Sequence, residues 1–229
     1  MTNNIINLVV VSHPDDEILG FGGTGSELVV RGEKVQPIIM SGLVEARNRR
    51  PDSSKLIEDI IKANSFLGFE KPVLANFPNL KMNTVPHIDL VKFIEECIIK
   101  FNPKRIFTHH PNDLNDDHKQ TSRACAASVR LFQRNKDIRP LESFYYLEIP
   151  SSTDWYMPNS EFGFMPNTFF DVTNSINNKI EALSYYQDVM RSAPHPRSIQ
   201  MIKGLASYRG GQSNFKYAEA FQLAFRRDF

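Results

Sequence analysis

Cysteine is scarce in this sequence, with only Cys97 and Cys125 among 229 residues. Each lies in an apolar, helix-like pattern, which predicts two buried, reduced thiols rather than a disulfide or a pair of metal ligands. A signal peptide is not expected either, because the N-terminal segment has no basic region and its apolar run is too short. We therefore expect a cytoplasmic protein.

Net charge and long apolar runs are missing too. The 27 basic and 26 acidic residues leave a net charge of +1, which gives no bulk electrostatic reason to expect nucleic acid or an anionic membrane as a partner. No stretch approaches the ~20 apolar residues of a membrane span. We find no internal repeat, low-complexity tract or flexible linker, so residues 1–229 are expected to form one domain. The sequence leaves a homo-oligomer open.

The sequence instead alternates between strand-like and helix-like segments. Strands are predicted at 5–12, 34–41, 71–77, 104–109, 141–149 and 168–172, and helices at 23–31, 52–67, 86–101, 116–134, 173–190 and 196–208, the last stopped by Gly210-Gly211. This order predicts an α/β protein with a mostly parallel sheet and helices on both faces. We expect residues 1–149 to form the core and residues 150–229 to complete the site. Ligands bind such sheets outside the carboxyl ends of the strands.

The stretch Val9–Gly25 (VVVSHPDDEILGFGGTG) combines two signatures. Residues 20–25 spell G-x-G-x-x-G, which is typical of a dinucleotide-binding turn. In such a turn the first glycine directly follows the strand, whereas here a His-Pro pair and three acidic residues intervene. The acidic residues would also place negative charge where phosphates bind. Gly22, Gly23 and Gly25 are better explained as small residues that let a helix pack closely on the sheet.

A metal site is the other interpretation of this stretch. A catalytic zinc takes three protein ligands from His and Asp or Glu and keeps an open position for water. His13 and Asp16 lie three residues apart after a strand, and Asp15 would lie beside the metal-bound water. A third ligand is expected from Thr108–His118 (THHPNDLNDDH), which also follows a strand. A lone acidic residue more often caps a helix, and a lone histidine is more often structural, but two clusters at two strand ends favour a metal site.

The sequence His13–Glu17 (HPDDE) matches the hallmark motif of the LmbE-like, or N-acetylglucosaminylphosphatidylinositol de-N-acetylase, superfamily, and the chain resembles that family along nearly its whole length. Further matches are PNDLNDDH, Tyr185-Tyr186-Gln187, Arg209-Gly210 and Ala218-Glu219-Ala220-Phe221. The resemblance implies a Rossmann-like three-layer fold and a zinc-dependent hydrolase that removes an N-acetyl group from an N-acetylglucosamine-type sugar.

By position, the resemblance also implies roles for individual residues. His13, Asp16 and His118 match the zinc ligands, and Asp15 matches the general base that takes a proton from metal-bound water. Two nitrogens and one carboxylate also suit Fe2+, manganese or cobalt. The implied substrate is a small or carrier-linked N-acetylamino sugar.

The chain departs from the family pattern at several positions. Some relatives carry a histidine three residues before the last ligand that can stabilise the oxyanion, and here Asn115 stands there. His109 or His110 would be substitutes for that role, although either could equally be structural. Relatives often begin the second helix with a substrate-binding arginine, whereas here Lys55 begins it and Arg47 lies upstream in a basic loop. The aspartate usual after Phe-Pro is Asn79.

Three functions therefore remain open at this point. The leading one is a zinc-dependent N-deacetylase, with His195 in the C-terminal part as a further candidate for contact with the substrate. The glycine run keeps a nucleotide-binding oxidoreductase as an alternative. A non-catalytic relative that binds a sugar or a metal is the third.

Overall fold

A seven-stranded sheet runs through the centre of the protein in the computed structural model, which describes residues 5–41, 53–156, 163–186 and 188–228. The strand order is β3-β2-β1-β4-β5-β7-β6. The first five strands in this order are parallel, and β7 runs antiparallel to both of its neighbours. The strands are β1 (Ile6–Val11), β2 (Lys34–Ile39), β3 (Val73–Leu74), β4 (Arg105–His109), β5 (Ser143–Leu147), β6 (Thr168–Asp171) and β7 (Ala218–Arg226).

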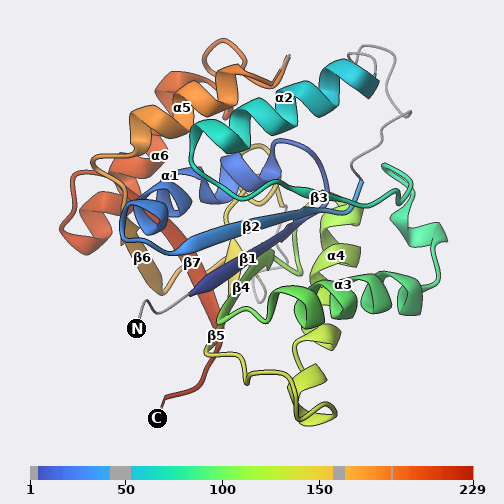
Figure 1. The fold of residues 1–229 in the computed structure, drawn as a ribbon. Coiled ribbons are helices and arrows are strands. Elements are labelled where there is room, and N and C mark those ends of the chain that lie inside the picture. The colour runs from blue at the N-terminus through green and yellow to red at the C-terminus, as the bar shows by residue number, and fades with distance from the viewer. Residues whose placement is uncertain (1–4, 42–52, 157–162, 187, 229) are drawn as a thin grey trace.

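Helices cover both faces of this sheet, as Figure 1 shows. The helices are α1 (Asp16–Val30), α2 (Ser53–Phe66), α3 (His87–Phe101), α4 (Asp116–Ser128), α5 (Ile176–Ser184) and α6 (Ile199–Ser213), with short 3-10 turns at Met82–Thr84 and Leu131–Gln133. Helices α1, α2, α5 and α6 contribute apolar side chains to one core, and α3 and α4 to the other. The three-layer α/β architecture expected from the sequence is confirmed.

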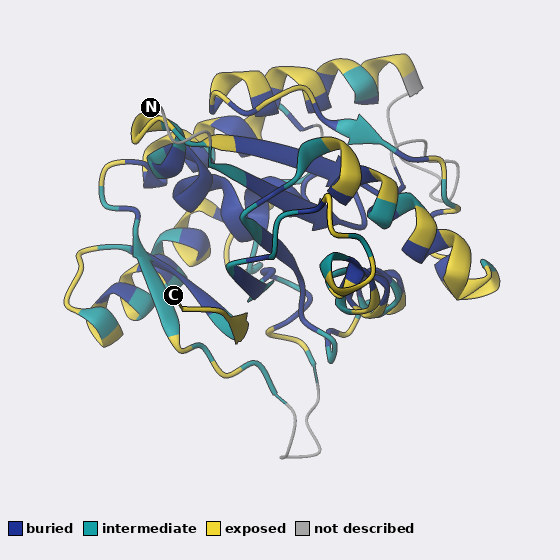
Figure 2. Cartoon of the chain, turned by 60° about the horizontal axis from the view of Figure 1, so that its bottom comes forward, coloured by how far each residue is buried: buried dark blue, intermediate teal, exposed yellow. Residues whose placement is uncertain are grey.

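Strand β1 shows why the two cores form. Its side chains alternate between the faces of the sheet: Val9 and Val11 belong to the first core, whereas Leu8 and Val10 belong to the second. All four are fully buried. Figure 2 shows that the central strands are buried and that the helices are exposed mainly on their outer sides. An uninterrupted apolar run is what a strand covered on both faces requires.

Helix α1 begins seven residues before the predicted start at Gly23, and this prediction was wrong. The helix starts at Asp16, directly after the loop that follows β1, so the glycine run lies inside the helix and forms no turn between strand and helix. A Cβ atom on Gly23 would come within 2.9 Å of Val172 Cγ1. The glycines do allow close packing, but only Gly23 meets the sheet, at Glu219 of β7, whereas Gly22 would meet Lys179 of α5 and Gly25 would meet Phe69. The geometry of a dinucleotide-binding turn is absent from this described segment.

The other differences lie mainly in the second half of the chain. Helix α4 ends at Ser128 rather than at 134, and α5 is confined to Ile176–Ser184 rather than 173–190. Helix α6 continues through Gly210-Gly211 to Ser213, where Asn214 takes a left-handed conformation that ends it. Strand β7 was not predicted. Both cysteines are free and buried, as expected.

None of the described helices combines the length and the apolar character that a bilayer-crossing segment needs.

Candidate metal centre

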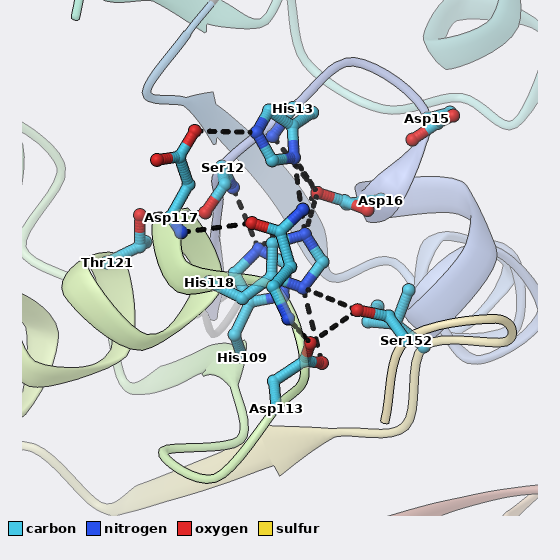
Figure 3. Close-up of polar contacts among 12 residues, drawn as sticks. Ser12, His13, Asp15, Asp16, His109, Asp113, Asp117, His118, Thr121 and Ser152 are labelled. Atoms are coloured by element: carbon cyan, nitrogen blue, oxygen red, sulfur yellow. Dashed lines mark hydrogen bonds and ion pairs between the residues drawn. The ribbon is translucent and has the colours of Figure 1, made fainter. Parts of the chain in front are cut away.

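The predicted ligands converge at the carboxyl ends of β1 and β4, which are neighbours in the sheet. His13 lies two residues beyond the last residue of β1, and Asp16 is the first residue of α1. His118 lies in the first turn of α4, after the loop that follows β4. Figure 3 shows the three side chains pointing toward one another. The parallel arrangement of the strands thus joins two segments 105 residues apart.

The ligand atoms of these three side chains form a tight triangle. Asp16 Oδ2 lies 3.2 Å from His13 Nδ1 and 3.1 Å from His118 Nε2. The two ring nitrogens are 3.2 Å apart. A tetrahedral zinc with bonds of about 2.0–2.1 Å separates its ligand atoms by about 3.3 Å. The three residues therefore fit a single divalent cation, and all three side chains are buried.

A carboxylate lies at the second ring nitrogen of each histidine. His13 Nε2 is 3.0 Å from Asp117 Oδ2, and His118 Nδ1 is 3.2 Å from Asp113 Oδ2. Such pairing fixes the tautomer and the ring orientation of histidines that ligate metals. Asp117 is itself held by the backbone amide of Met82 at 3.0 Å. Both histidines thus have the supporting partners that a metal ligand needs.

The electrostatics of the cluster favour a positive charge at its centre. Burial alone would lower the pKa of His118, but Asp16 and Asp113 outweigh it and raise that pKa to about 10. Burial would raise the pKa of Asp16, yet His118 and His13 hold it well below its usual value. The pKa of His13 is raised because its hydrogen bonds to Asp117 and Asp16 outweigh burial. A proton or a metal cation is therefore stabilised at this position.

Asp113 connects the cluster to the loop after β5. Its carboxylate accepts hydrogen bonds from the hydroxyls of Ser152 and Thr153, the latter at 2.9 Å. Burial would raise the pKa of Asp113, but His118 in particular lowers it to about 2. Asp113 therefore stays ionised and holds both His118 and the start of the C-terminal segment.

Asp15 lies beside the triangle rather than within it (Figure 3). Its backbone has φ 104° and ψ −32°, a left-handed conformation that is strained for a residue other than glycine. Such strain costs of order 1–3 kcal/mol and persists only where surrounding contacts hold it. One oxygen of its carboxylate, Oδ2, pairs with Arg197 Nη1 at 3.0 Å. Its backbone amide donates to Glu17 Oε2 at 3.0 Å.

Glu17 is the centre of a buried network beneath Asp15. Its second oxygen accepts hydrogen bonds from Asn64 Nδ2 at 2.9 Å and from the hydroxyl of Tyr186. Burial raises the pKa of Glu17 to about 7, although these hydrogen bonds oppose the rise. The network links α1, α2 and the segment just after α5, and it helps to fix the strained loop at Asp15.

A cavity of about 350 Å³ opens onto the triangle and Asp15. Its wall combines the cluster with residues from the loops before the 3-10 turn at Met82–Thr84, before α4, after β5 and before α6. The lining residues are His13, Asp15, Asp16, Asn79, Leu80, Leu114, Asn115, His118, Ser151, Ser152, Trp155, Arg191, His195 and Arg197. The buried side-chain amide of Asn79 has no hydrogen-bond partner for its oxygen or its nitrogen among the described residues. The cavity thus offers polar groups to a ligand as well as a metal position.

The remaining predicted residues that the structure describes fall into two groups, those that line the cavity and those that do not. Asn115 and His195 line the cavity. Asn115 caps α4, with its side-chain oxygen accepting from Asp117 N at 3.0 Å, and the His195 ring lies edge-on to Trp155. Arg47 lies outside the described residues.

His109 and His110 do not line the cavity. His109 Nε2 accepts from Ser12 N at 2.8 Å, its ring stacks on His118, and burial in particular lowers its pKa to about 3. His110 Nε2 lies 3.1 Å from Gln222 Oε1, and its Nδ1 accepts from Asn112 N. The interpretation of both as structural residues agrees with these contacts.

Sequence reasoning missed several residues that complete the site. Asp113 and Asp117 lie inside the PNDLNDDH motif. Two acidic residues close to a predicted histidine ligand could have indicated carboxylates that orient the ligating imidazoles. Arg197 and Glu17 gave no such signal, because their partners lie 182 and 169 residues away in the chain.

The fold and the site together define an α/β protein with a candidate His–Asp–His metal centre at the carboxyl ends of its parallel strands. Residues 8–129 match the model of the family PIG-L, described as GlcNAc-PI de-N-acetylase. The chain belongs to this family, as the sequence resemblance indicated. No curated protein sequence gives a significant match.

Solved structures with the same fold carry more than one activity. N,N'-diacetylchitobiose deacetylase from Pyrococcus horikoshii aligns with a TM-score of 0.76 and 17% identity over 96% of this chain and 84% of its own. The 4-carboxy-2-hydroxymuconate hydratase from Pseudomonas putida KT2440 aligns at 0.77 with 19% identity over 98% of each chain. The zinc-inhibited form of teicoplanin deacetylase aligns at 0.73 with 16% identity over 97% and 99%. At these identities the similarity shows the fold.

Proposed function

We propose that this protein is a metal-dependent N-deacetylase that hydrolyses the acetamide of an N-acetylglucosamine-type sugar. The observation that carries the proposal is the triangle of His13, Asp16 and His118, with ligand atoms 3.1–3.2 Å apart and Asp15 in the same cavity. Membership of the family described as GlcNAc-PI de-N-acetylase supports the choice of substrate.

His13, Asp16 and His118 would hold the cation, and their two nitrogens and one oxygen suit zinc or Fe2+. The bound metal would polarise the amide carbonyl and lower the pKa of water. The description of teicoplanin deacetylase in a zinc-inhibited form supports divalent-metal binding by this fold. Asp113 and Asp117 would keep the two histidines oriented and their metal-facing nitrogens available.

Asp15 would act as the general base. Its carboxylate lines the cavity next to the triangle, where it can take a proton from the attacking water and then donate it to the departing amine. Water adds to the carbonyl carbon, the C–N bond breaks, and the products are acetate and the free amino sugar. The strained backbone at Asp15 supports this role, because strain of this kind is concentrated at functional sites.

The developing oxyanion needs a hydrogen-bond donor in addition to the cation. Asn115 is our candidate, since it lines the cavity and its oxygen already serves the cap of α4. The side-chain amide nitrogen of Asn115 would then donate a hydrogen bond to the oxyanion. His195, in the loop before α6, would contact the sugar.

The proposal is tested by acetate release from N-acetylglucosamine and its glycosides after loading with Zn2+ or Fe2+. We expect turnover by the wild type, loss of at least about 100-fold in kcat for Asp15→Asn, and retained metal in that variant by elemental analysis. His118→Gln should lose both metal and activity. Full turnover by Asp15→Asn would contradict the role of Asp15, and stoichiometric metal in His118→Gln would exclude it as a ligand.

A hydratase is a second candidate, because the Pseudomonas putida hydratase shares the fold over 98% of both chains. Addition of water to a carbon–carbon double bond, like amide hydrolysis, needs a water molecule and a base. The family match nevertheless favours amide hydrolysis. Loss of ultraviolet absorbance from an unsaturated dicarboxylic acid, without acetate release from any acetylated sugar, would support the hydratase.

A further inference from the structure

Arg197 reaches the cavity from the segment just before α6, where its backbone is fixed. Its amide donates to His195 Nδ1 at 3.1 Å, and its carbonyl accepts from Arg191 N at 3.3 Å. The next residue, Ser198, caps α6 by accepting from Met201 N at 3.1 Å. A side chain beside a capped helix end, with both of its own backbone groups satisfied, is held more precisely than one in an open loop.

The guanidinium of Arg197 joins the loops that follow β1 and β5. Its Nε donates to Ser151 Oγ at 2.7 Å, and its Nη1 donates to Asp15 Oδ2 at 3.0 Å. Because the guanidinium is planar and rigid, these two hydrogen bonds together fix its direction. The side chains of Arg197 and Asp15 are only 24% and 12% exposed, so solvent screens this ion pair less than a pair on the open surface.

Both partners of this guanidinium have strained backbones. Asp15 has φ 104° and Ser151 has φ 67°, values that residues other than glycine rarely adopt. Such strain persists only where surrounding contacts over-determine the conformation. Glu17 holds the backbone amide of Asp15 at 3.0 Å, and Arg197 holds its carboxylate. Asp15 is therefore fixed at its backbone and at its side chain by two different parts of the chain.

The direction of the Asp15 carboxylate matters for the proposed reaction. A general base must come within hydrogen-bond reach of the proton that it takes, and an aspartate side chain can rotate about two bonds. The hydrogen bond from Arg197 Nη1 to Asp15 Oδ2 selects one of these orientations. A misplacement of about 1 Å in a catalytic group can lower a rate by about 100-fold.

We propose that Arg197 is a positioning residue: its guanidinium holds the carboxylate of Asp15 in the orientation from which Asp15 takes the proton of the attacking water. This inference rests on the proposed deacetylase function and adds a residue to it. Arg197 acts through Asp15 and contacts none of the three metal-ligand candidates in the described structure. Its loss should therefore lower kcat and leave KM and metal content close to the wild-type values.

The first test is steady-state deacetylation of N-acetylglucosamine glycosides by the metal-loaded protein. In Arg197→Gln we expect kcat to fall by about 10–100-fold with KM little changed. Arg197→Lys, which keeps the charge without the planar fork, should recover part of this loss. In protein that already carries Asp15→Asn, the same Arg197→Gln change should lower kcat no further, because residues that act as a unit are not additive.

Arg134→Gln is the matched control, since it removes an exposed arginine that is paired with Glu95 away from the cavity. It should keep the wild-type kcat. If Arg197→Gln does not fold, Ser151→Ala takes its place, because it removes the second support of the same guanidinium and should lower kcat by a smaller factor. A rise in kcat in Arg197→Gln, a loss confined to KM, or a full further loss in the Asp15→Asn background would overturn the inference.

Crystal structures of the wild type and of Arg197→Gln test the inference without turnover. We expect the Asp15 carboxylate to leave its wild-type orientation in the variant while the metal triangle keeps its geometry. An unchanged Asp15 would overturn the positioning role even in an active deacetylase. A displaced Asp15 in a protein whose wild type releases no acetate would support the placement of Asp15 by Arg197 and contradict the proposed function alone.

Discussion

His13 and His118 are each engaged at both ring nitrogens, one toward the triangle and one toward a carboxylate. The carboxylates Asp113 and Asp117 never reach the cavity lining among the described residues. Their effect on chemistry is therefore indirect, through the orientation and basicity of the imidazoles. The two histidines would therefore bind the metal directly, whereas Asp113 and Asp117 would influence the metal affinity.

Asp113→Asn should weaken zinc affinity by about 10–100-fold, because the amide can no longer supply a negative charge to His118 Nδ1. The measurement is competition against a chromophoric chelator at constant pH. Asp137→Asn, which changes an exposed aspartate before β5, is the matched control. Equal zinc affinities for Asp113→Asn and the wild type would show that His118 needs no carboxylate partner.

His110 should make the metal-free protein sensitive to mild acid. Burial lowers its pKa below 6.5, and its Nδ1 accepts a hydrogen bond that protonation would remove. A depressed histidine pKa contributes stability that is present above 6.5 and is lost as pH falls through the folded-state pKa. The fall in Tm between pH 7.5 and 5.0 should therefore be shallower in His110→Gln than in the wild type.

The exposed His87, at the start of α3, supplies the control for this measurement. His87→Gln should follow the wild-type pH profile. A wild-type slope in His110→Gln would show that other groups cause the acid sensitivity.

At the scale of elements, α1 is the helix on which the site depends, and its glycines are constrained by neighbours. In Gly23→Ala the new Cβ would lie 2.9 Å from Val172 Cγ1 and 3.0 Å from Val172 Cβ. We expect destabilisation by about 1–3 kcal/mol from overpacking, even though alanine is the better helix former. Urea denaturation with unchanged m-value measures the effect.

Gly204 in α6 is the matched control, because a Cβ at that position meets no atom within 4 Å. Gly204→Ala should stabilise the protein by up to about 1 kcal/mol through helix propensity alone. If both substitutions stabilised the protein equally, the close packing of α1 would carry no energetic weight.

The same elements show what the sequence could and could not predict. The apolar run of β1 and the position of the two His/Asp clusters were readable, because a buried strand and metal-ligand residue types both leave local patterns. The start of α1 could not be predicted from the sequence, since a helix rich in glycine is stabilised by its tertiary contacts rather than by helix propensity. The pairing of Arg197 with Asp15 was equally hidden, because it depends on how a distant loop folds back over the sheet.

At the scale of the whole molecule, the metal would join the segments that follow two neighbouring parallel strands, β1 and β4. Its ligands lie just before α1, at the first residue of α1 and in α4, so only the folded chain presents them together. Binding to the folded state alone stabilises it by mass action, by about 2.7 kcal/mol at a free metal concentration 100 times Kd.

Addition of Zn2+ to chelator-treated protein should therefore raise Tm, and excess chelator should reverse the rise. His118→Gln should show little of this shift, whereas His87→Gln should show all of it. A Tm that does not respond to Zn2+, Fe2+, manganese or cobalt would argue against a metal centre in these residues.

Strand β7 has a consequence for the order in which the chain can fold. In the sheet, β6 pairs with β7 and with no other described strand, although β7 is made after it. Glu219 of β7 also accepts hydrogen bonds from Gly23 N, Thr24 N and Lys179 Nζ. On a ribosome, residues 168–171 have no strand to join, and a buried lysine has no counter-charge, until residues 218–226 emerge. We therefore expect α1, which begins with a candidate metal ligand, to reach its final packing only after β7 has joined the sheet.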